Sequence, residues 1–232
     1  MKKDISAGLI KWNKLKKKTS GSSKKAPLIH PPIRTLLLDI GMVILTNGWD
    51  RYSRKRAAKM FGINEEEFSD RHKFFFDSFE AGRMTLHEYL QFVVFYVERE
   101  FTETEFITFM LSQSKPIRGS MEYFMALKKR HNLKIISLNN EGRELNEYRI
   151  KTFHLDKLFD AYLSSCYVHL RKSDKEFFLM GCDISNTPPE NCLFIDDRLI
   201  HVQIARTIGL NAVQFTGLSA AKKQIAQFGL EL

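Results

Sequence analysis

The stretch LLLDIGMVIL, Leu36–Leu45, decides how the rest of this sequence is interpreted. Its run of aliphatic residues is typical of a buried strand, yet Asp39 stands inside it and Gly41 follows two positions later. A buried carboxylate is costly unless it is hydrogen-bonded, paired or bound to a metal. Asp39 is therefore a candidate catalytic nucleophile, a candidate metal ligand, or a relic of such a role.

Several short apolar runs of the same kind recur along the chain, each bounded by polar or glycine-rich breaks. They are TLLLDI (35–40), LKIISL (133–138), AYLSS (161–165), CLFID (192–196) and NAVQF (211–215). Continuous apolar runs suit strands that are covered on both faces, as in a parallel sheet. Helical patterns lie between the later runs: MEYFMALKKR after a candidate N-cap at Ser120, EGRELNEYRIKTF, and LIHVQIARTIG closed by Gly209. This alternation predicts an α/β fold, a doubly wound parallel sheet with right-handed crossovers.

The segment between the first two predicted strands has a different pattern. Residues 49–115 hold only helical candidates, over 51–62, 64–80, 85–100 and 102–113, with candidate N-caps at Asn64 and Thr102. Its many aromatic residues are enough for a small bundle of its own. We therefore expect an α/β core from residues 34–48 and 116–232, with residues 49–115 inserted as a helical cap over the carboxyl end of the first strand.

The basic character of the chain is concentrated at its N-terminus. The formal net charge is +9, and residues 1–25 contain nine lysines against one acid, Asp4. Residues 1–33 are interpreted as a basic, disordered segment; the alternatives are a basic amphipathic anchor for an anionic membrane, nucleic acid or a partner, and an organellar presequence. The remaining chain is close to neutral.

The cysteine count and the hydropathy indicate a compartment. Cys166, Cys182 and Cys192 are odd in number and lack a C-x-x-C spacing, which argues against a zinc site or a disulfide framework and suits a reducing environment. No apolar run reaches the roughly 18–20 residues of a membrane span. The expected location is cytoplasmic.

Polar residues follow four of the predicted strands. Asp39 ends the first, Asn139-Asn140 follow the second, Arg171-Lys172 lie in the loop after the third, and Asp196-Asp197 end the fourth. These loops open onto one edge of a doubly wound sheet. Such a group of acids is most simply explained by Mg²⁺, with Lys172 facing an anionic substrate. Each residue also has a structural interpretation, as a cap, a turn residue or a solvated lysine.

The ordered set resembles the haloacid dehalogenase-like (HAD) hydrolase superfamily with a helical cap of the first type. The matching pieces are LLLDIGMVIL, IISLNN, LRKSD and FIDDRLIHVQIARTIG, and the resemblance covers about residues 34–216. It implies a Rossmann-like core and a nucleophilic aspartate. The first motif is most similar to the Asp-x-Gly subgroup that includes sugar-1-phosphate phosphatases.

The resemblance also implies roles for individual residues. Asp39 would be the nucleophile that forms an aspartyl intermediate, and Lys172 would hold both Asp39 and the substrate anion. Asn139 and Asn140 would bind the transferred group.

The metal ligands follow in the same way. Asp196 and Asp197 would bind Mg²⁺ together with the Asp39 carboxylate and the backbone carbonyl of Gly41. The metal would neutralise charge on the phosphoryl group.

Three of the motifs depart from the family pattern. The family's usual first motif is Asp-x-Asp-Gly, and its last two positions are Gly41 and Met42 here, so the second acid, which protonates the leaving group and is typically worth ~10²–10⁴ in rate, is missing. Leu138 stands where Ser or Thr is usual, and the neighbouring Ser137 faces the other side of a strand. His201 replaces a frequent Asn or Asp, and it is interpreted, like the other histidines, as a surface or packing residue.

The leading hypothesis is a Mg²⁺-dependent phosphatase acting on a small phosphorylated metabolite. A second is a catalytically weak or inactive HAD-like binding module that its basic N-terminus docks to a membrane or nucleic acid. A third is a 2-haloacid dehalogenase, whose halide leaves without a proton.

Overall fold

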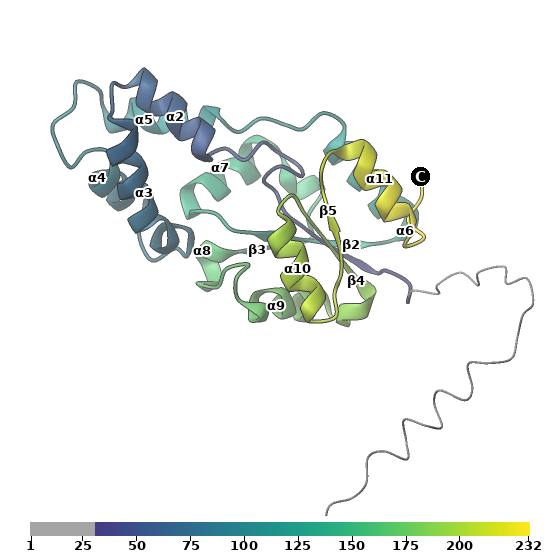
Figure 1. Ribbon diagram of the computed structural model, residues 1–232. Coiled ribbons are helices and arrows are strands. Elements are labelled where there is room, and N and C mark those ends of the chain that lie inside the picture. Colours follow the sequence, from purple (N-terminus) through teal and green to yellow (C-terminus); the bar gives the residue numbers. More distant parts are fainter. Residues whose placement is uncertain (1–30) are drawn as a thin grey trace, which may run out of the picture. The chain divides into compact units, whose positions relative to one another are not determined.

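Five parallel strands form one sheet in the computed structural model, which describes residues 31–232. The strands are β1 (Thr35–Leu38), β2 (Lys134–Asn139), β3 (Ala161–Ser164), β4 (Cys192–Asp196) and β5 (Asn211–Gln214). Their order is β3-β2-β1-β4-β5, and every neighbouring pair is parallel. The predicted doubly wound α/β fold is confirmed (Figure 1). The basic segment of residues 1–25 lies outside the described residues, and its proposed contacts stay a prediction.

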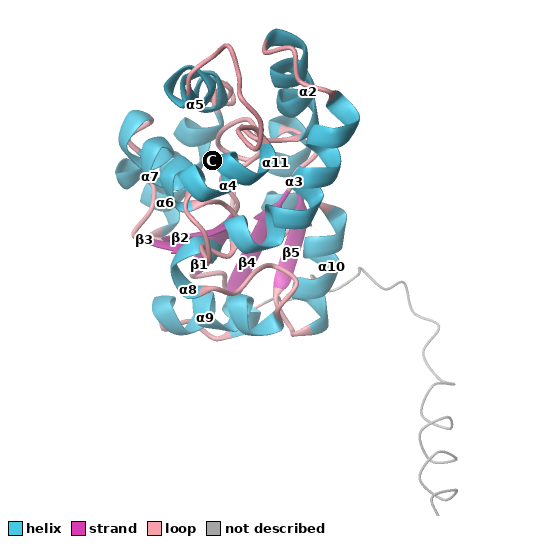
Figure 2. Cartoon of the chain, turned by 90° about the vertical axis from the view of Figure 1, so that its left-hand side faces the viewer, coloured by secondary structure: helices cyan, strands magenta, loops and turns pink. Residues whose placement is uncertain are grey.

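Helices cover both faces of the sheet because successive side chains of each strand point to opposite sides. Leu36 and Leu38 of β1 pack with residues of α6 (Ser120–His131), α7 (Arg143–Thr152) and α11 (Leu218–Ala226). Leu37, between them, packs with α9 (Lys175–Ser185) and α10 (Leu199–Thr207) on the other face. Figure 2 shows the strands enclosed between these helices. The short α8 (Ser165–Val168) and the 3₁₀ turns η1 (Leu155–Lys157) and η2 (Pro189–Asn191) complete the core.

The segment between β1 and β2 is built from four helices, which we call the helical insertion. They are α2 (Arg51–Met60), α3 (Glu65–Glu80), α4 (Leu86–Val93) and α5 (Glu103–Ser112). The expected N-caps are confirmed: the Asn64 side chain accepts from the Glu67 backbone, and Thr102 forms a capping box with Glu105. A cluster of aromatic and aliphatic residues, among them Trp49, forms the interior of this insertion.

Two predicted element boundaries are wrong. The helix expected over residues 85–100 ends at Val93, and the guanidinium of Arg99 instead donates a hydrogen bond to the Val94 carbonyl that a longer helix would have used. Ser120 is the first residue of α6 and its N-cap is Gly119, whose φ of +74° favours glycine. The Ser120 hydroxyl donates to the Val43 carbonyl, which explains why it does not cap its own helix.

The two chain segments that join the helical insertion to the core run side by side. The Thr46 amide donates to the Lys115 carbonyl, and the Ile117 amide donates to the Ile44 carbonyl. Because these two hydrogen bonds hold the connecting segments together, the helical insertion joins the core through a pair of adjacent chain segments. The insertion lies above the carboxyl edge of the sheet, where β1 ends.

The expectations about membrane spans and disulfides concern the helices and cysteines of the described residues. Within residues 31–232 every helix is too short or too polar to cross a bilayer. Cys166, Cys182 and Cys192 are buried, and none of the three forms a disulfide.

Candidate active site

The strand order reverses between β1 and β4, so their carboxyl ends open into one crevice. Asp39 directly follows β1, and its backbone amide donates to the carbonyl of Ile195 in β4 at 3.0 Å. Asp196 is the last residue of β4. The topology therefore places two carboxylates from distant parts of the sequence on adjacent strands.

Lys172 joins these two carboxylates. Its ammonium lies 2.9 Å from an oxygen of Asp39 and 2.7 Å from an oxygen of Asp196, and the side chain is 1% exposed. Burial alone would lower the pKa of Lys172, but Asp196 and Asp39 outweigh it and the pKa is raised. The side-chain oxygen of Asn140 accepts from the Lys172 backbone amide at 3.0 Å, which holds this loop in place. Lys172 is thus a buried, charged group between the predicted nucleophile and a predicted metal ligand.

The predicted metal acids converge on one point. One carboxylate oxygen each from Asp39, Asp196 and Asp197 lie within 4.8 Å of one another. Three carboxylates beside the single ammonium of Lys172 leave two negative charges uncompensated, which is the charge that one divalent cation neutralises. Carboxylate oxygens are the donors that Mg²⁺ prefers, so the residues present fit this metal. Gly41 lines the same cleft as Asp39.

The carboxylates differ in their electrostatic surroundings. Burial raises the pKa of Asp39 well above its usual range, against the opposing effect of Lys172. Burial acts in the same direction on Asp196, but Lys172 and His201 together bring the pKa of that carboxyl below its usual range. Burial and the neighbouring Asp196 raise the pKa of Asp197. Asp196 is therefore the firmly ionised member of the group.

His201 corrects the sequence interpretation, which took it for a surface or packing residue. It is buried, and its Nδ1 lies 3.0 and 3.1 Å from the two oxygens of Asp196. The Arg198 backbone amide donates to the same carboxylate at 2.8 Å. His201 lies in the first turn of α10, which begins three residues after Asp196, so its side chain reaches back toward the end of β4. That short strand-to-helix spacing is the signal that could have identified it. The exposed His154 and His169 agree with the interpretation.

The two asparagines have different neighbours. Asn140 supports the Lys172 loop, whereas the Asn139 amide nitrogen lies 3.3 Å from Glu141 and 3.4 Å from Asn146. Glu141 is itself paired with Arg149 at 2.6 Å, and both side chains are buried. Sequence reasoning missed this ion pair because neither residue belongs to a recognised motif.

Leu138 lies where the family has a hydroxyl. It shares the sheet face of Leu37 and packs in the α9–α10 cluster. Ser137 pairs in register with Leu38 on the opposite face, and within residues 31–232 its hydroxyl has no hydrogen-bond partner. Ser137 therefore does not replace the missing hydroxyl.

The loop that carries Lys172 also contacts the helical insertion. The guanidinium of its neighbour Arg171 forms ion pairs with Asp77 and, at 2.6 Å, with Glu80 of α3. Glu80 lines the cleft, and burial raises its pKa to about 7 against the opposing effect of Arg171. These contacts bridge the core and the insertion beside the site.

A cleft of about 650 Å³ lies between the core residues and the helical insertion. Its core half includes Asp39, Asn139, Asn140, Lys172 and Asp197; its other half is formed by residues of the insertion, among them Trp49, Arg54 and Phe76. The Asn47 side chain occupies the space that an acidic side chain at position 41 would need. A Cβ at Gly41 would lie 2.8 Å from the side-chain oxygen of Asn47.

A doubly wound sheet with an aspartate, a lysine and an acid pair at its switch point, covered by a helical insertion, is the architecture of one class of hydrolases with an α/β core. The chain belongs to the haloacid dehalogenase-like hydrolase family, whose model matches residues 34–209. The family resemblance expected from the sequence is thereby confirmed.

Two curated proteins show the range of the relatives. Drimenol cyclase drtB of Aspergillus calidoustus is 24% identical over 201 residues, which are 83% of this chain and 36% of that protein. The chloroplast flavin mononucleotide hydrolase 1 of Arabidopsis thaliana is 35% identical over 82 residues, 33% of this chain and 34% of that protein. The matches span about a third of the length of these curated relatives.

Solved structures share the fold at low sequence identity. A HAD family enzyme from Bacteroides thetaiotaomicron has a TM-score of 0.69 and 20% identity, over 79% of this chain and 93% of that chain. A complex of that enzyme with magnesium and inorganic phosphate has a TM-score of 0.65 at 18% identity, over 78% and 93% of the two chains. A HAD-like hydrolase from Porphyromonas gingivalis has a TM-score of 0.67 and 22% identity, over 83% and 98%.

Proposed function

We propose that this protein is a Mg²⁺-dependent phosphatase of small phosphorylated metabolites that works through an aspartyl-phosphate intermediate. The observation that carries the proposal is the convergence of Asp39, Lys172, Asp196 and Asp197 at the switch point. The names of two relatives support the phosphatase chemistry: one is a flavin mononucleotide hydrolase, and one was crystallised with magnesium and phosphate.

The proposed reaction uses groups already in place. An Asp39 oxygen attacks the phosphorus; the new O–P bond forms as the bond to the leaving oxygen breaks, and that oxygen takes its electron pair. A water molecule then attacks the phosphorus, breaks the aspartyl O–P bond and releases inorganic phosphate, which restores the carboxylate. The ammonium of Lys172, 2.9 Å from Asp39, attracts the phosphoryl oxygens and steadies the nucleophile. A Mg²⁺ ion bound by Asp39, Asp196 and Asp197 would supply further charge neutralisation.

The leaving group must depart without a carboxylic acid at position 41. Gly41 has no side chain, and the adjacent Asn47 amide is not an acid at neutral pH. The leaving oxygen therefore takes its proton from solvent. Substrates with good leaving groups, such as aryl or sugar-1-phosphates, should react faster than simple alkyl phosphates.

The test is a panel of phosphate monoesters with and without Mg²⁺. The panel should contain an aryl phosphate, a sugar-1-phosphate, an alkyl phosphate and flavin mononucleotide. We expect Mg²⁺-dependent release of phosphate that is lost in Asp39→Asn. The matched control is Asp183→Asn, because Asp183 is an exposed acid on α9 outside the cleft. Turnover that survives Asp39→Asn, or no metal-dependent turnover on any ester, would contradict the proposal.

The same preparation tests the dehalogenase hypothesis. Halide release from a 2-haloacid without added metal would identify a dehalogenase, a chemistry named for one fold neighbour with a TM-score of 0.59. The buried acids and lysine favour the phosphatase, since they make a site for a dianionic group and its metal. For the cellular setting we propose the cytoplasm, where the three reduced thiols would be stable.

A further inference from the structure

Arg54 is a cation of the cleft that forms no ion pair within residues 31–232, although the more distant Asp50 and Glu80 attract it. It lies on α2, is half-buried, and lines the same cleft as Asp39 and Lys172. Its guanidinium donates one hydrogen bond, to the Trp49 carbonyl at 2.7 Å. Among residues 31–232 no carboxylate lies within ion-pair distance of it. A guanidinium carries five N–H donors, so most of them are left for another group.

Three other cations of the cleft, although not the exposed Arg198, are by contrast neutralised. Lys172 is paired with two carboxylates, and Arg149 with Glu141. Lys73 is paired with Asp70 at 2.9 Å. Desolvating a charge without a counter-charge is unfavourable, so a half-buried, unpaired guanidinium in a binding cleft is a position where a ligand anion would be stabilised.

A second cation adjoins Arg54. The guanidinium of Arg51 donates a hydrogen bond of 2.7 Å to the neighbouring Tyr52 and lies over the face of its ring, and within residues 31–232 it forms no ion pair. Arg51, Arg54 and Ser69 also line a further hollow of about 330 Å³, so they form the boundary between it and the main cleft. Lys55, which also lines that hollow, is paired with Glu65.

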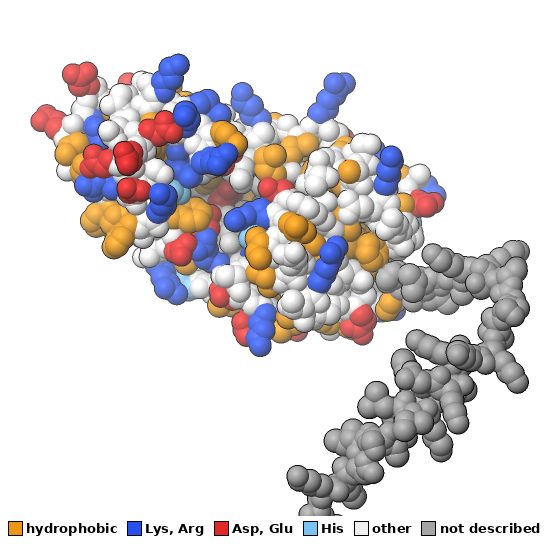
Figure 3. Space-filling model, viewed as in Figure 1, with side chains coloured by type: hydrophobic (Ala, Val, Ile, Leu, Met, Phe, Trp, Pro, Cys, Tyr) orange, Lys and Arg blue, Asp and Glu red, His pale blue; other side chains and the backbone are white. Residues whose placement is uncertain are grey.

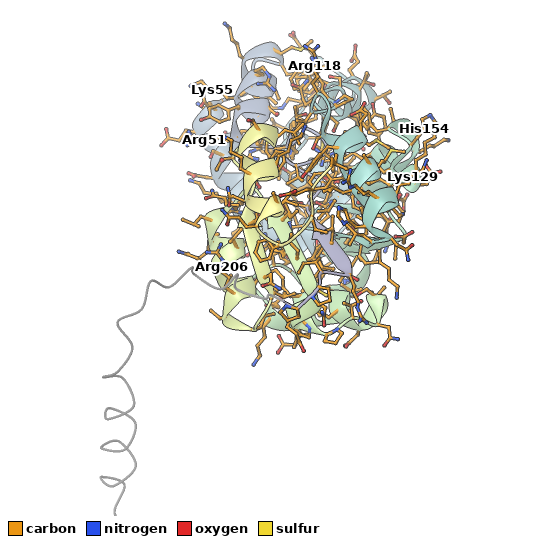
Figure 4. The ribbon with its side chains drawn as sticks, turned by 90° about the vertical axis from the view of Figure 1, so that its right-hand side faces the viewer. Arg51, Lys55, Arg118, Lys129, His154 and Arg206 are labelled. Atoms are coloured by element: carbon orange, nitrogen blue, oxygen red, sulfur yellow. The ribbon has the colours of Figure 1, made fainter. Side chains whose placement is uncertain are left out.

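Arg51 is an exposed residue of the helical insertion. Figure 4 shows Arg51 and Lys55 close together on the helical insertion. On the face seen in Figure 3, Lys and Arg side chains mix with acidic ones over the same region. Within residues 31–232 neither Arg54 nor Arg51 lies within ion-pair distance of one of these acids.

Aromatic rings also line the cleft that holds Lys172 and Arg54. They belong to Trp49, Phe76 and Phe79. Phe79 is held firmly, since its ring stacks on Tyr89 at 4.5 Å between centroids and its edge abuts Gly142. The body of a ligand that reaches from Lys172 toward Arg54 therefore passes apolar walls.

We propose that Arg54, assisted by Arg51, binds a second acidic group of the substrate. The substrate class is then a phosphate monoester with a carboxylate or a second phosphate at the far end of an apolar or planar body. The guanidinium fork matches either group with two parallel hydrogen bonds. This inference rests on the proposed phosphatase function and adds the chemistry of the distal group.

The test compares substrates that differ only in that group. Phenyl phosphates bearing a para-carboxymethyl, para-phosphonomethyl or neutral para-carbamoylmethyl substituent share a leaving group, because the methylene insulates it. We expect wild type to favour at least one acidic member over its neutral partner by roughly tenfold or more in kcat/KM, mainly through KM. A comparison of the carboxymethyl substrate with the phosphonomethyl substrate identifies which acidic group is preferred.

The variants test whether Arg54 causes that preference. Arg54→Met should bring the ratio of acidic to neutral kcat/KM close to one, and Arg54→Lys should keep part of it. Lys59→Met, which removes an exposed cation of the same helix outside the cleft, should keep all of it. The ratio is internal to each variant, so partial loss of folded protein does not change it. A wild-type ratio near one for both the carboxymethyl and the phosphonomethyl substrate, or an unchanged ratio in Arg54→Met, would overturn the inference.

A binding measurement keeps this inference separate from the phosphatase activity. Calorimetric titration of Asp39→Asn, and of Asp39→Asn with Arg54→Met, with the same acidic and neutral compounds needs no turnover. If no ester is hydrolysed, the proposed function fails, while selective binding of the acidic compounds that depends on Arg54 would still support the subsite. Equal binding of acidic and neutral compounds would refute it.

Discussion

Replacing Asp39 by asparagine should make the metal-free protein more stable while removing its activity. The reason is the excess of acids around Lys172. At an effective dielectric constant of about 20, two carboxylates no more than 4.8 Å apart repel by at least about 3.5 kcal/mol. Asp39 has two such neighbours, whereas its attraction to Lys172 at 2.9 Å is about 5.7 kcal/mol on the same scale.

Burial adds to the cost of the Asp39 charge, so its removal should be favourable. We expect a gain of about 1–2 kcal/mol, in the usual range for relieving a strained functional site. A protein of this size gains about 2–4 °C in Tm for each kcal/mol. The measurement is thermal unfolding of wild type and Asp39→Asn at pH 7.5 in EDTA, with Asp183→Asn as the control that should not change.

The raised pKa of Asp39 sets the direction in which the stability difference between wild type and Asp39→Asn changes with pH. A carboxyl whose folded pKa lies above its unfolded value of 3.8 contributes stability at low pH, and this is lost as the pH rises through the folded pKa. The advantage of Asp39→Asn should therefore grow with pH and vanish below about pH 4. Added Mg²⁺ should narrow the difference, because it stabilises the wild type more. A lower Tm for Asp39→Asn in EDTA at pH 7.5 would refute this account of the charge balance.

Further predictions concern the residues around the site. His201→Leu should weaken activation by Mg²⁺ about 10–100-fold, with His201→Asn less affected, as measured by titrating the metal in the phosphatase assay. Arg149→Met should destabilise by about 3–5 kcal/mol in urea unfolding, because it leaves the buried Glu141 unpaired, and adding Glu141→Gln should recover part of the loss. Gly142→Ala should destabilise by about 1–3 kcal/mol, since the new methyl would meet the Phe79 ring at 2.2 Å; Phe79→Leu in the same protein should relieve the clash.

The local pattern of the chain was sufficient to place the predicted catalytic residues together. Each of Asp39, Lys172 and Asp196 follows or ends an apolar run, and the carboxyl ends of parallel strands must share one edge. Chain order and strand direction are enough to bring these residues to one edge of the sheet. Helix caps such as Asn64 and Thr102 were predictable for a similar reason, because capping depends on residues three positions apart.

Other residues had no local signal. His201 looks like an ordinary helical residue until α10 is docked against β4, and Ser120 looks like a cap until its hydroxyl meets the Val43 carbonyl. Arg149 reaches Thr46 and Ser114, which lie 103 and 35 positions away in the sequence. Such contacts depend on how whole elements pack, which periodicity does not encode.

The sequence by itself determined the doubly wound class of the sheet, the identity of the acids and lysine at its edge, and the helical character of the insertion, because these follow from periodicity and chain order. Only the tertiary structure decided which charges are neutralised. Lys172 turned out to be shared by two carboxylates, Asp196 to be supported by His201, and Arg54 to form no ion pair within residues 31–232. Charge pairing depends on distances of 3–4 Å between side chains far apart in the chain, and those distances exist only once the sheet and the insertion have packed.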